Sequence, residues 1–322
     1  MTTMTDDTLP ATPRAIRDEM IAFFIMAGLL AIVPLTGIYP FFVMQALCFA
    51  LLACAFNLLI GYGGLLSFGH AMFLGTAGYV SAHALKVWGL PPELGILAGT
   101  AAAAGLGVIT GLVAIRRQGI YFAMITLALS QLLYFIYLQA PFTHGEDGIQ
   151  GIPQGYLFGI FNLSNSTVLY YVILAGFLFG FLVIFRTINS PFGEVLKAIR
   201  ENEPRAISLG YKTDQYKLVA YILSGTLAGL AGALKVFVAQ NASLTDVEVA
   251  MSGQIVLMTL VGGLGTVFGP VVGAFVIVAM QQYLSGLGQW VTVIQGVIFV
   301  ACVLTFRRGV IGEIAHFFRR SL

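Results

Sequence analysis

Residues 186–217 read RTINSPFGEVLKAIRENEPRAISLGYKTDQYK, and this charged stretch lies between two apolar segments that are each long enough to span a membrane. It contains six of the sixteen lysines and arginines of the chain. Because lysine and arginine are retained on the cytoplasmic side of a membrane, the stretch is predicted to be a cytoplasmic loop.

Local signals within this loop predict two short helices. Ser190 can cap the first helix, with Pro191 in the first helical position, where the missing N–H costs nothing. Pro204 ends that helix and can begin a second one. Gly210 supplies a left-handed stop. The loop is therefore predicted to be a compact helical elbow.

The first predicted helix carries a narrow apolar stripe formed by Val195, Leu196 and Ile199. The elbow is either a solvated connection or a surface on which another protein docks. Two capped helices with an apolar stripe exceed what a connection requires, which favours docking. The charges are equally consistent with solvation. The residues predicted to couple the chain to a docked partner are Glu194, Arg200, Glu201, Glu203, Arg205 and Gly210.

The composition predicts an all-α protein that lies in a bilayer. Hydrophobic residues make up 58% and charged residues 9% of the chain, whereas soluble domains carry about 25% charged residues. The chain has no basic patch with interleaved aromatic residues, the pattern that would indicate nucleic-acid binding. Cys48, Cys54 and Cys302 lie in apolar segments without metal-binding spacing, so they are predicted to be reduced packing residues.

We predict a polytopic helical bundle of about ten crossings, within a range of about eight to ten. The transmembrane domain covers 20–306, and cytoplasmic tails at 1–19 and 307–322 place both termini inside. Residues 252–306 permit one or three crossings, the first of three being broken at 262–270. The other spans are predicted at about residues 20–36, 41–60, 71–87, 94–115, 120–139, 167–185 and 218–239.

Two glycine-rich stretches interrupt the apolar segments. Residues 61–70, GYGGLLSFGH, are too rich in glycine for a regular helix and are predicted to form a break, which at membrane depth must be buried in protein or line a cavity. The sequences at 63–75 and 262–273 resemble each other and are consistent with an internal duplication or with chance similarity.

Polar residues at predicted membrane depth are candidates for a substrate path, with interhelical hydrogen bonding as the alternative role. They are Asn57, Ser67, His70, Thr126, Ser130 and Gln131. The loop at 141–166 has two carboxylates and no lysine or arginine, so it is predicted to lie outside. Its Glu146 and Asp147 either contact a partner protein outside the membrane or belong to a plain solvated loop.

The chain shows no energy source of its own. It lacks the GxxxxGK[ST] pattern that cradles ATP phosphates. The predicted spans contain no Asp or Glu away from their ends, which argues against proton- or sodium-coupled transport. No metal cluster or catalytic dyad supports an enzyme. A transporter whose ATPase is a separate subunit docked at the elbow explains this combination.

Five ordered motifs carry a family resemblance: GYGGLLSFGHAMFLGTAGY, RRQGIYFAMITLAL, THGEDGIQGIP, SPFGEVLKAIRENEPRAISLGYKTDQYKLVAYILSGTLAGLAGAL and VGGLGTVFGPVVGA. Together they resemble the branched-chain amino acid permease family of ATP-binding cassette transporters, in particular its LivM-type subunit, over roughly residues 40–310. One departure is His144, where the family pattern more often has glycine.

The resemblance implies a type II importer-like fold in a bacterial inner membrane. It further implies a heterodimer with a second permease, two ATPase subunits that bind ATP and Mg, and a periplasmic substrate-binding protein, with no cofactor in this chain. The implied substrates are leucine, isoleucine and valine, or a related small amino acid, amide or carboxylate. A stand-alone channel or secondary carrier, and a membrane scaffold without transport, are the alternatives.

Overall fold

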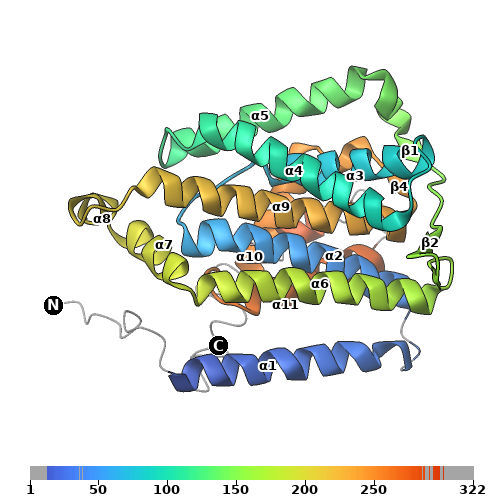
Figure 1. Ribbon diagram of the computed structural model, residues 1–322, viewed down its shortest axis with the longest axis horizontal. Helices are drawn as coiled ribbons and strands as arrows, with labels where there is room; N and C mark the ends of the chain where they lie inside the picture. The colour runs from blue at the N-terminus through green and yellow to red at the C-terminus, as the bar shows by residue number, and fades with distance from the viewer. Residues whose placement is uncertain are drawn as a thin grey trace.

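The computed structural model describes residues 13–284 except 36 and 38, together with residues 286, 290, 293–297 and 300. The predicted tail at 307–322, most of the tail at 1–19, Cys302 and the predicted crossings beyond residue 284 lie wholly or largely outside the described residues. Figure 1 shows long helices that run side by side along the longest axis of the molecule.

Helices account for most of the described chain, as the composition predicted. The long helices are α1 (Pro13–Ile32), α2 (Pro40–Asn57), α3 (His70–Lys86), α4 (Pro92–Ala114), α5 (Ile120–Gln139), α6 (Ser166–Ile188), α9 (Thr213–Ala239), α10 (Val249–Gly262) and α11 (Gly269–Leu284). The short elements are η1 (Val33–Leu35), η2 (Leu58–Tyr62), η3 (Pro141–Thr143), η4 (Gly145–Asp147), α7 (Pro191–Glu201), α8 (Glu203–Ser208) and η5 (Leu244–Asp246).

Five of these helices are long and apolar enough to cross a membrane. They are Pro40–Tyr62, Pro92–Ala114, Ile120–Gln139, Ser166–Ile188 and Thr213–Ala239. The apolar part of α1, together with α10 and α11, is shorter. A multi-pass membrane protein is thus supported, while the total of about ten crossings and the side on which the termini lie stay predictions.

Helix α2 forms the centre of the bundle. Nearly all of its residues are buried, and it packs against α6, α9 and α11. Helices α3, α4 and α9 form a second closely packed group, in which small residues let backbones approach. A Cβ atom added at Gly232 of α9 would lie 2.1 Å from the carbonyl oxygen of Leu74 in α3. Glycine at this position therefore sets how closely the two helices pack.

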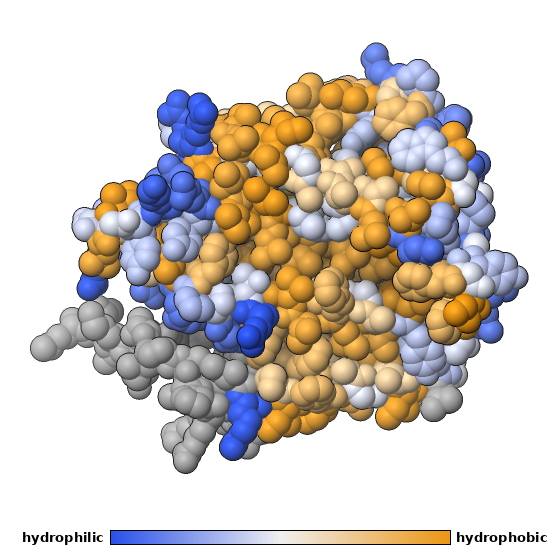
Figure 2. All heavy atoms as spheres, in the orientation of Figure 1, coloured by the Kyte–Doolittle hydropathy of each residue, from blue (hydrophilic) through white to orange (hydrophobic). Residues whose placement is uncertain are grey.

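The two ends of the bundle differ in structure. One end, here called the elbow end, carries α7, α8 and the turn at 115–119. The opposite loop end carries two small antiparallel pairs, in which β1 (Ile149–Gln150) pairs with β4 (Asn241–Ala242) and β2 (Tyr156–Leu157) with β3 (Phe161–Asn162). Figure 2 shows hydrophobic residues over the middle of the visible face and hydrophilic residues towards both ends, the pattern expected of a protein that spans a bilayer.

Candidate functional site

The predicted helical elbow is confirmed as two short helices at one end of the bundle (Figure 1). Helix α7 begins after Ser190, whose Oγ accepts a hydrogen bond from the Gly193 N–H at 3.4 Å, and Pro191 occupies the first turn. Gly210 has a φ of +91°, the left-handed stop that the sequence predicted. Sequence reasoning missed the Asn202 cap of α8, where Oδ1 accepts from the Arg205 N–H at 3.1 Å.

The predicted docking stripe on α7 faces the wrong way for docking. Leu196 is 0% and Ile199 2% exposed, because α7 covers the end of the bundle with its apolar side. A Cβ atom added at Gly63 would lie 3.7 Å from Leu196 Cδ1. The prediction that this stripe is available to a partner is therefore wrong.

The exposed apolar side chains of the elbow lie instead on α8 and directly after it. Ile207 is 55%, Leu209 70% and Tyr211 41% exposed. We call these three residues the α8 ridge. Arg205 and Glu201, two of the predicted coupling residues, are also exposed. The ridge was detectable in the sequence as the apolar residues around Gly210, but sequence reasoning selected the more regular stripe on α7.

The remaining predicted coupling residues make contacts within the chain. Glu194 pairs with Lys197 at 2.9 Å on the exposed side of α7. Glu203 pairs with Lys217 of α9 at 2.5 Å, with both side chains largely buried. The pair ties the start of α8 to the first turns of α9. The buried pair therefore joins α8 to α9, whereas the exposed pair lies within α7 and contributes little.

Arg200 connects α7 to the bundle. Its guanidinium donates a hydrogen bond to the carbonyl oxygen of Gly61, in the π-helical turn η2 that ends the α2 segment. The side-chain stem lies against Gly64, which has a φ of +68° and where an added Cβ atom would approach Arg200 Cγ to 2.9 Å. Glycine at this position thus leaves room for the arginine stem.

Both glycine-rich stretches interrupt helices. The predicted break after α2 is confirmed: the chain leaves the helix after η2 and resumes at His70, and we call residues 63–69 the first break. Residues 263–268, between α10 and α11, form the second break. The two stretches share a helix–break–helix arrangement, while their origin by duplication remains a prediction.

Asn57, the last residue of α2, bonds to the second break. Its Nδ2 donates to the Thr266 carbonyl oxygen at 2.8 Å, and its Oδ1 accepts from the Gly265 N–H at 3.0 Å. The backbones are close here as well, since a Cβ atom added at Gly61 would lie 2.8 Å from the Gly265 nitrogen. Asn57 is buried, so these bonds satisfy polar groups that would otherwise be costly.

Three more of the predicted path residues lie around the first break. Thr126 Oγ1 of α5 accepts from the Phe68 N–H at 3.2 Å, and Ser67 Oγ accepts from the Gly69 N–H at 3.2 Å. The third residue is His70, the first residue of α3, and Ser67, His70 and Thr126 are all buried. The structure thus places Ser67, His70 and Thr126 at the first break, with Asn57 in the helix that leads into it.

His70 bonds to a residue that sequence reasoning missed. Its Nε2 lies 2.8 Å from Ser224 Oγ, and that hydroxyl donates its one proton to the Ala55 carbonyl oxygen at 2.6 Å. Nε2 must therefore carry the ring proton and donate it to Ser224. Nδ1 then has a free lone pair and, among the described residues, no hydrogen-bond partner. A serine in the apolar span at 218–239 was the available signal.

Ser130 and Gln131 lie further along α5, beyond Thr126. Ser130 is buried, and its hydroxyl has no hydrogen-bond partner within the described part of the chain. Gln131 is half-buried. The six path candidates therefore divide into a group of four at the first break or in the helix that leads into it, and these two. The described residues include no group of three side chains suited to hold a metal ion.

The loop end presents Glu146 and Asp147 in η4, both exposed. His144, just before them, has a φ of 58°, a left-handed conformation that glycine adopts more readily. This backbone requirement explains why a glycine suits the position at which the sequence departs from the family pattern.

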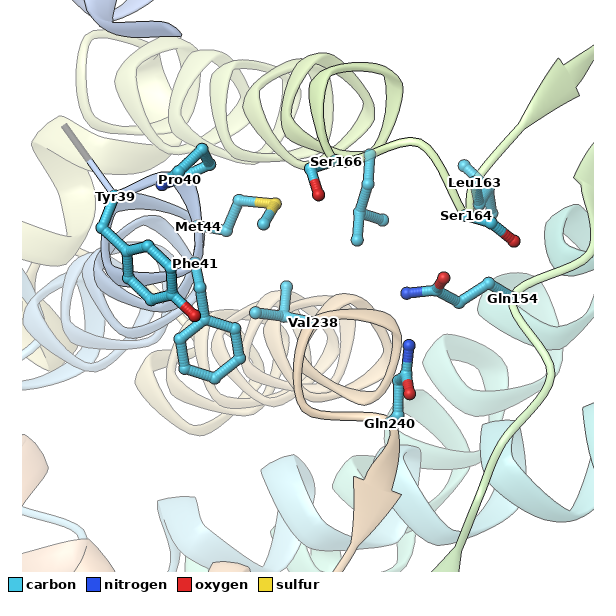
Figure 3. Close-up of a pocket in the computed structure, with 11 residues that line it drawn as sticks. Tyr39, Pro40, Phe41, Met44, Gln154, Leu163, Ser164, Ser166, Val238 and Gln240 are labelled. Atoms are coloured by element: carbon cyan, nitrogen blue, oxygen red, sulfur yellow. The ribbon is translucent and has the colours of Figure 1, made fainter. Parts of the chain in front are cut away.

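A recess of about 220 Å³ opens at the loop end, where α2 and α6 begin and α9 ends (Figure 3). The carboxamides of Gln154 and Gln240 point towards each other across it. Gln154 Nε2 also donates to the Phe237 carbonyl oxygen at 3.1 Å. The other lining residues are Tyr39, Pro40, Phe41, Met44, Leu163, Ser164, Ser166, Leu169 and Val238.

Comparison with known proteins decides the family. The model of the family described as "Branched-chain amino acid transport system / permease component" matches residues 38–304, which include the elbow and both breaks. The chain belongs to this permease family. No solved structure was found to match it.

Relatives of this chain differ in the solute that their names give. The high-affinity branched-chain amino acid transport system permease protein LivM of Escherichia coli K12 is 25% identical, covering 88% of this chain and 74% of LivM. The ribose import permease protein RbsC of Bacillus subtilis is 30% identical over 50% of each chain. The autoinducer 2 import system permease protein LsrC of Photorhabdus laumondii is 35% identical over 31% of this chain and 30% of LsrC. Membership therefore establishes a transport permease and leaves the solute open.

Proposed function

We propose that this chain is a membrane-spanning subunit of an ATP-binding cassette importer that carries branched-chain amino acids, or a related small amino acid, amide or carboxylate, into the cytoplasm. The observation that carries the proposal is the capped elbow, with its three exposed apolar side chains at one end of an apolar bundle. Such a ridge costs free energy in water and is typical of a docking surface.

The elbow receives an ATPase subunit in this proposal. The α8 ridge enters a groove of the ATPase, and the exposed Arg205 and Glu201 lie beside it. ATP and Mg are bound by two such subunits, and a second permease completes the membrane part. ATP binding supplies energy because the ATPase pair contacts two states of the elbow differently.

The opposite end receives a periplasmic substrate-binding protein. Glu146 and Asp147 are exposed there, on a loop without lysine or arginine between residues 141 and 166. The proposed orientation puts both termini and the cationic elbow in the cytoplasm of a bacterium, with the chain in the inner membrane. The polar groups around the first break line or border the path.

The test is reconstitution of this chain with the second permease, the ATPase subunits and the binding protein in liposomes. We expect uptake of radiolabelled leucine, isoleucine or valine that requires ATP on the cytoplasmic side, with competition by the other two amino acids. If only an amide, a carboxylate or another amino acid competes, that compound is the substrate, and it still belongs to the proposed class. ATP-independent uptake by this chain in liposomes without the ATPase would instead identify a channel or secondary carrier and overturn the proposal.

A further inference from the structure

We infer that Arg200 and Asn57 are positioning residues, which join the elbow to both helix breaks so that the three segments move as one body. The inference rests on the proposed function, because the ATPase is what would move the elbow. The connection between the elbow and the breaks rests on hydrogen bonds in the structure. It gives Arg200 an internal role in place of the predicted contact with a partner.

The first link runs from α7 to the first break. Arg200 donates to the Gly61 carbonyl oxygen and rests its stem on Gly64. Gly61 lies at the end of a helical segment, where carbonyl groups have no intrahelical partner, and a guanidinium is a strong donor to such an oxygen. The buried side of α7 adds Leu196 against Gly63. A displacement of α7 therefore displaces the start of the first break.

The second link runs from the end of α2 and the η2 turn, directly before the first break, to the second break. Asn57 bonds to both Thr266 and Gly265. One helical turn further along the chain, the backbone of Gly61 lies close to that of Gly265. Arg200 also reaches this point, since a Cβ atom added at Gly265 would lie 3.6 Å from its guanidinium nitrogen. The second break, which lies more than sixty residues from Arg200 in sequence, is thus held at the same place as the first.

A third contact passes from the first break to α5. Phe68 N–H donates to Thr126 Oγ1, and a Cβ atom added at Gly69 would lie 2.9 Å from the Thr126 carbonyl oxygen. Helix α5 is mostly exposed and packs less extensively than the central helices. It is therefore the element in contact with this body that can shift at the smallest cost in packing.

The alternative is that the same bonds only stabilise the fold. The two roles differ in one measurable respect. A purely stabilising bond lowers the free energy of unfolding when removed, but it leaves the native arrangement of the elbow and the second break unchanged. A positioning bond, when removed, allows the two segments to occupy several relative positions in the folded protein.

The experiment measures the distance between spin labels at Ala198 and Leu264. Both positions are exposed, the first on α7 and the second in the second break. The native cysteines are replaced by alanine, and the chain is studied in lipid nanodiscs without nucleotide. We expect one narrow distance distribution in the parent chain and a distribution about twofold broader in Arg200→Gln. Arg200→Lys should lie between them, because an ammonium donates to one carbonyl without the planar fork.

Arg117→Gln is the matched control, since Arg117 is exposed at the same end of the bundle and its variant should leave the distribution unchanged. An Arg200→Gln distribution as narrow as that of the parent chain, with or without a lower melting temperature, would overturn the inference. Asn57→Ala provides a second test, because it should broaden the distribution while leaving the contact of α7 with Gly61 in place.

A second readout uses the complex assembled with the ATPase and binding-protein subunits. In Arg200→Gln, we expect the stimulation of ATP hydrolysis by the binding protein to fall about tenfold while basal hydrolysis changes little, as loss of a charged hydrogen bond would produce. Unchanged stimulation would refute the transmission role. Failure of the ATPase to associate with the parent chain would count against the proposed function alone, because the distances in nanodiscs need no partner.

Discussion

The two helices of the elbow are adjacent in sequence but differ in what they contact. Helix α7 turns its apolar residues inward, so that Leu196 and Ile199 are buried. Helix α8 and the residue pair beyond it leave Ile207, Leu209 and Tyr211 exposed. The difference fits the proposed function, in which α7 connects the elbow to the bundle and α8 would present a surface to the ATPase.

Among the variants that test this difference between α7 and α8, the largest expected effect is on the free energy of unfolding. Leu196→Ala removes a fully buried side chain of α7, and we expect the free energy of unfolding to fall by about 3 kcal/mol. Ile207→Ala on α8 is the matched control, with an expected change within about 0.5 kcal/mol. Unfolding by denaturant in mixed micelles measures both values. Equal losses in the two variants would contradict the division between α7 and α8.

A second test addresses the connection that holds α8 in place. Lys217→Met leaves the largely buried Glu203 carboxylate without its partner at 2.5 Å, and we expect a loss of about 2 kcal/mol in the free energy of unfolding. The double variant Lys217→Met with Glu203→Leu should recover most of this loss, because no unpaired charge remains. A double variant less stable than the single one would show that the pair itself, and not the orphaned charge, dominates.

Assembly should respond to α8 and not to α7. Leu209→Ala removes the most exposed apolar side chain of the α8 ridge, and we expect the affinity for the purified ATPase subunit to fall about tenfold with unchanged stability. Ser208→Ala, at the adjacent exposed position, is the control and should leave the affinity unchanged. Titration of the ATPase onto nanodisc-embedded chain gives the dissociation constants. Identical constants for the parent chain and Leu209→Ala would remove the ridge from the interface.

The boundaries of the elbow were predictable because caps and stops act locally. Ser190, Pro191 and Gly210 each determine the backbone within a few residues, and all three have the predicted role. The break after α2 was predictable for the same reason, since consecutive glycines disfavour a helix. The bounds of α5, Ile120–Gln139, agree with the span predicted from its apolar run at about residues 120–139.

The orientation of α7 was not predictable from its own sequence. An apolar stripe indicates that one side of a helix avoids water, but it does not indicate whether the bundle or a separate protein covers that side. The partner of Asn57 was hidden for a related reason, since Gly265 lies 208 positions away in sequence. Contacts of this kind depend on how the helices assemble, which local patterns do not encode.

The smallest expected effect concerns two contacts on the exposed side of α7, an ion pair and a cation–ring contact, which both involve Lys197. Glu194→Gln removes an exposed ion pair with Lys197, and we expect a cost of about 0.5 kcal/mol that declines as salt is added. Lys197→Gln should cost more, because the Lys197 ammonium also lies 5.9 Å from the centre of the Tyr62 ring, next to the first break. The double-mutant cycle isolates the pair. Equal costs for both single variants would mean that the cation–ring contact contributes nothing, and α7 would then be joined to the η2 turn by Arg200 and the buried apolar side alone.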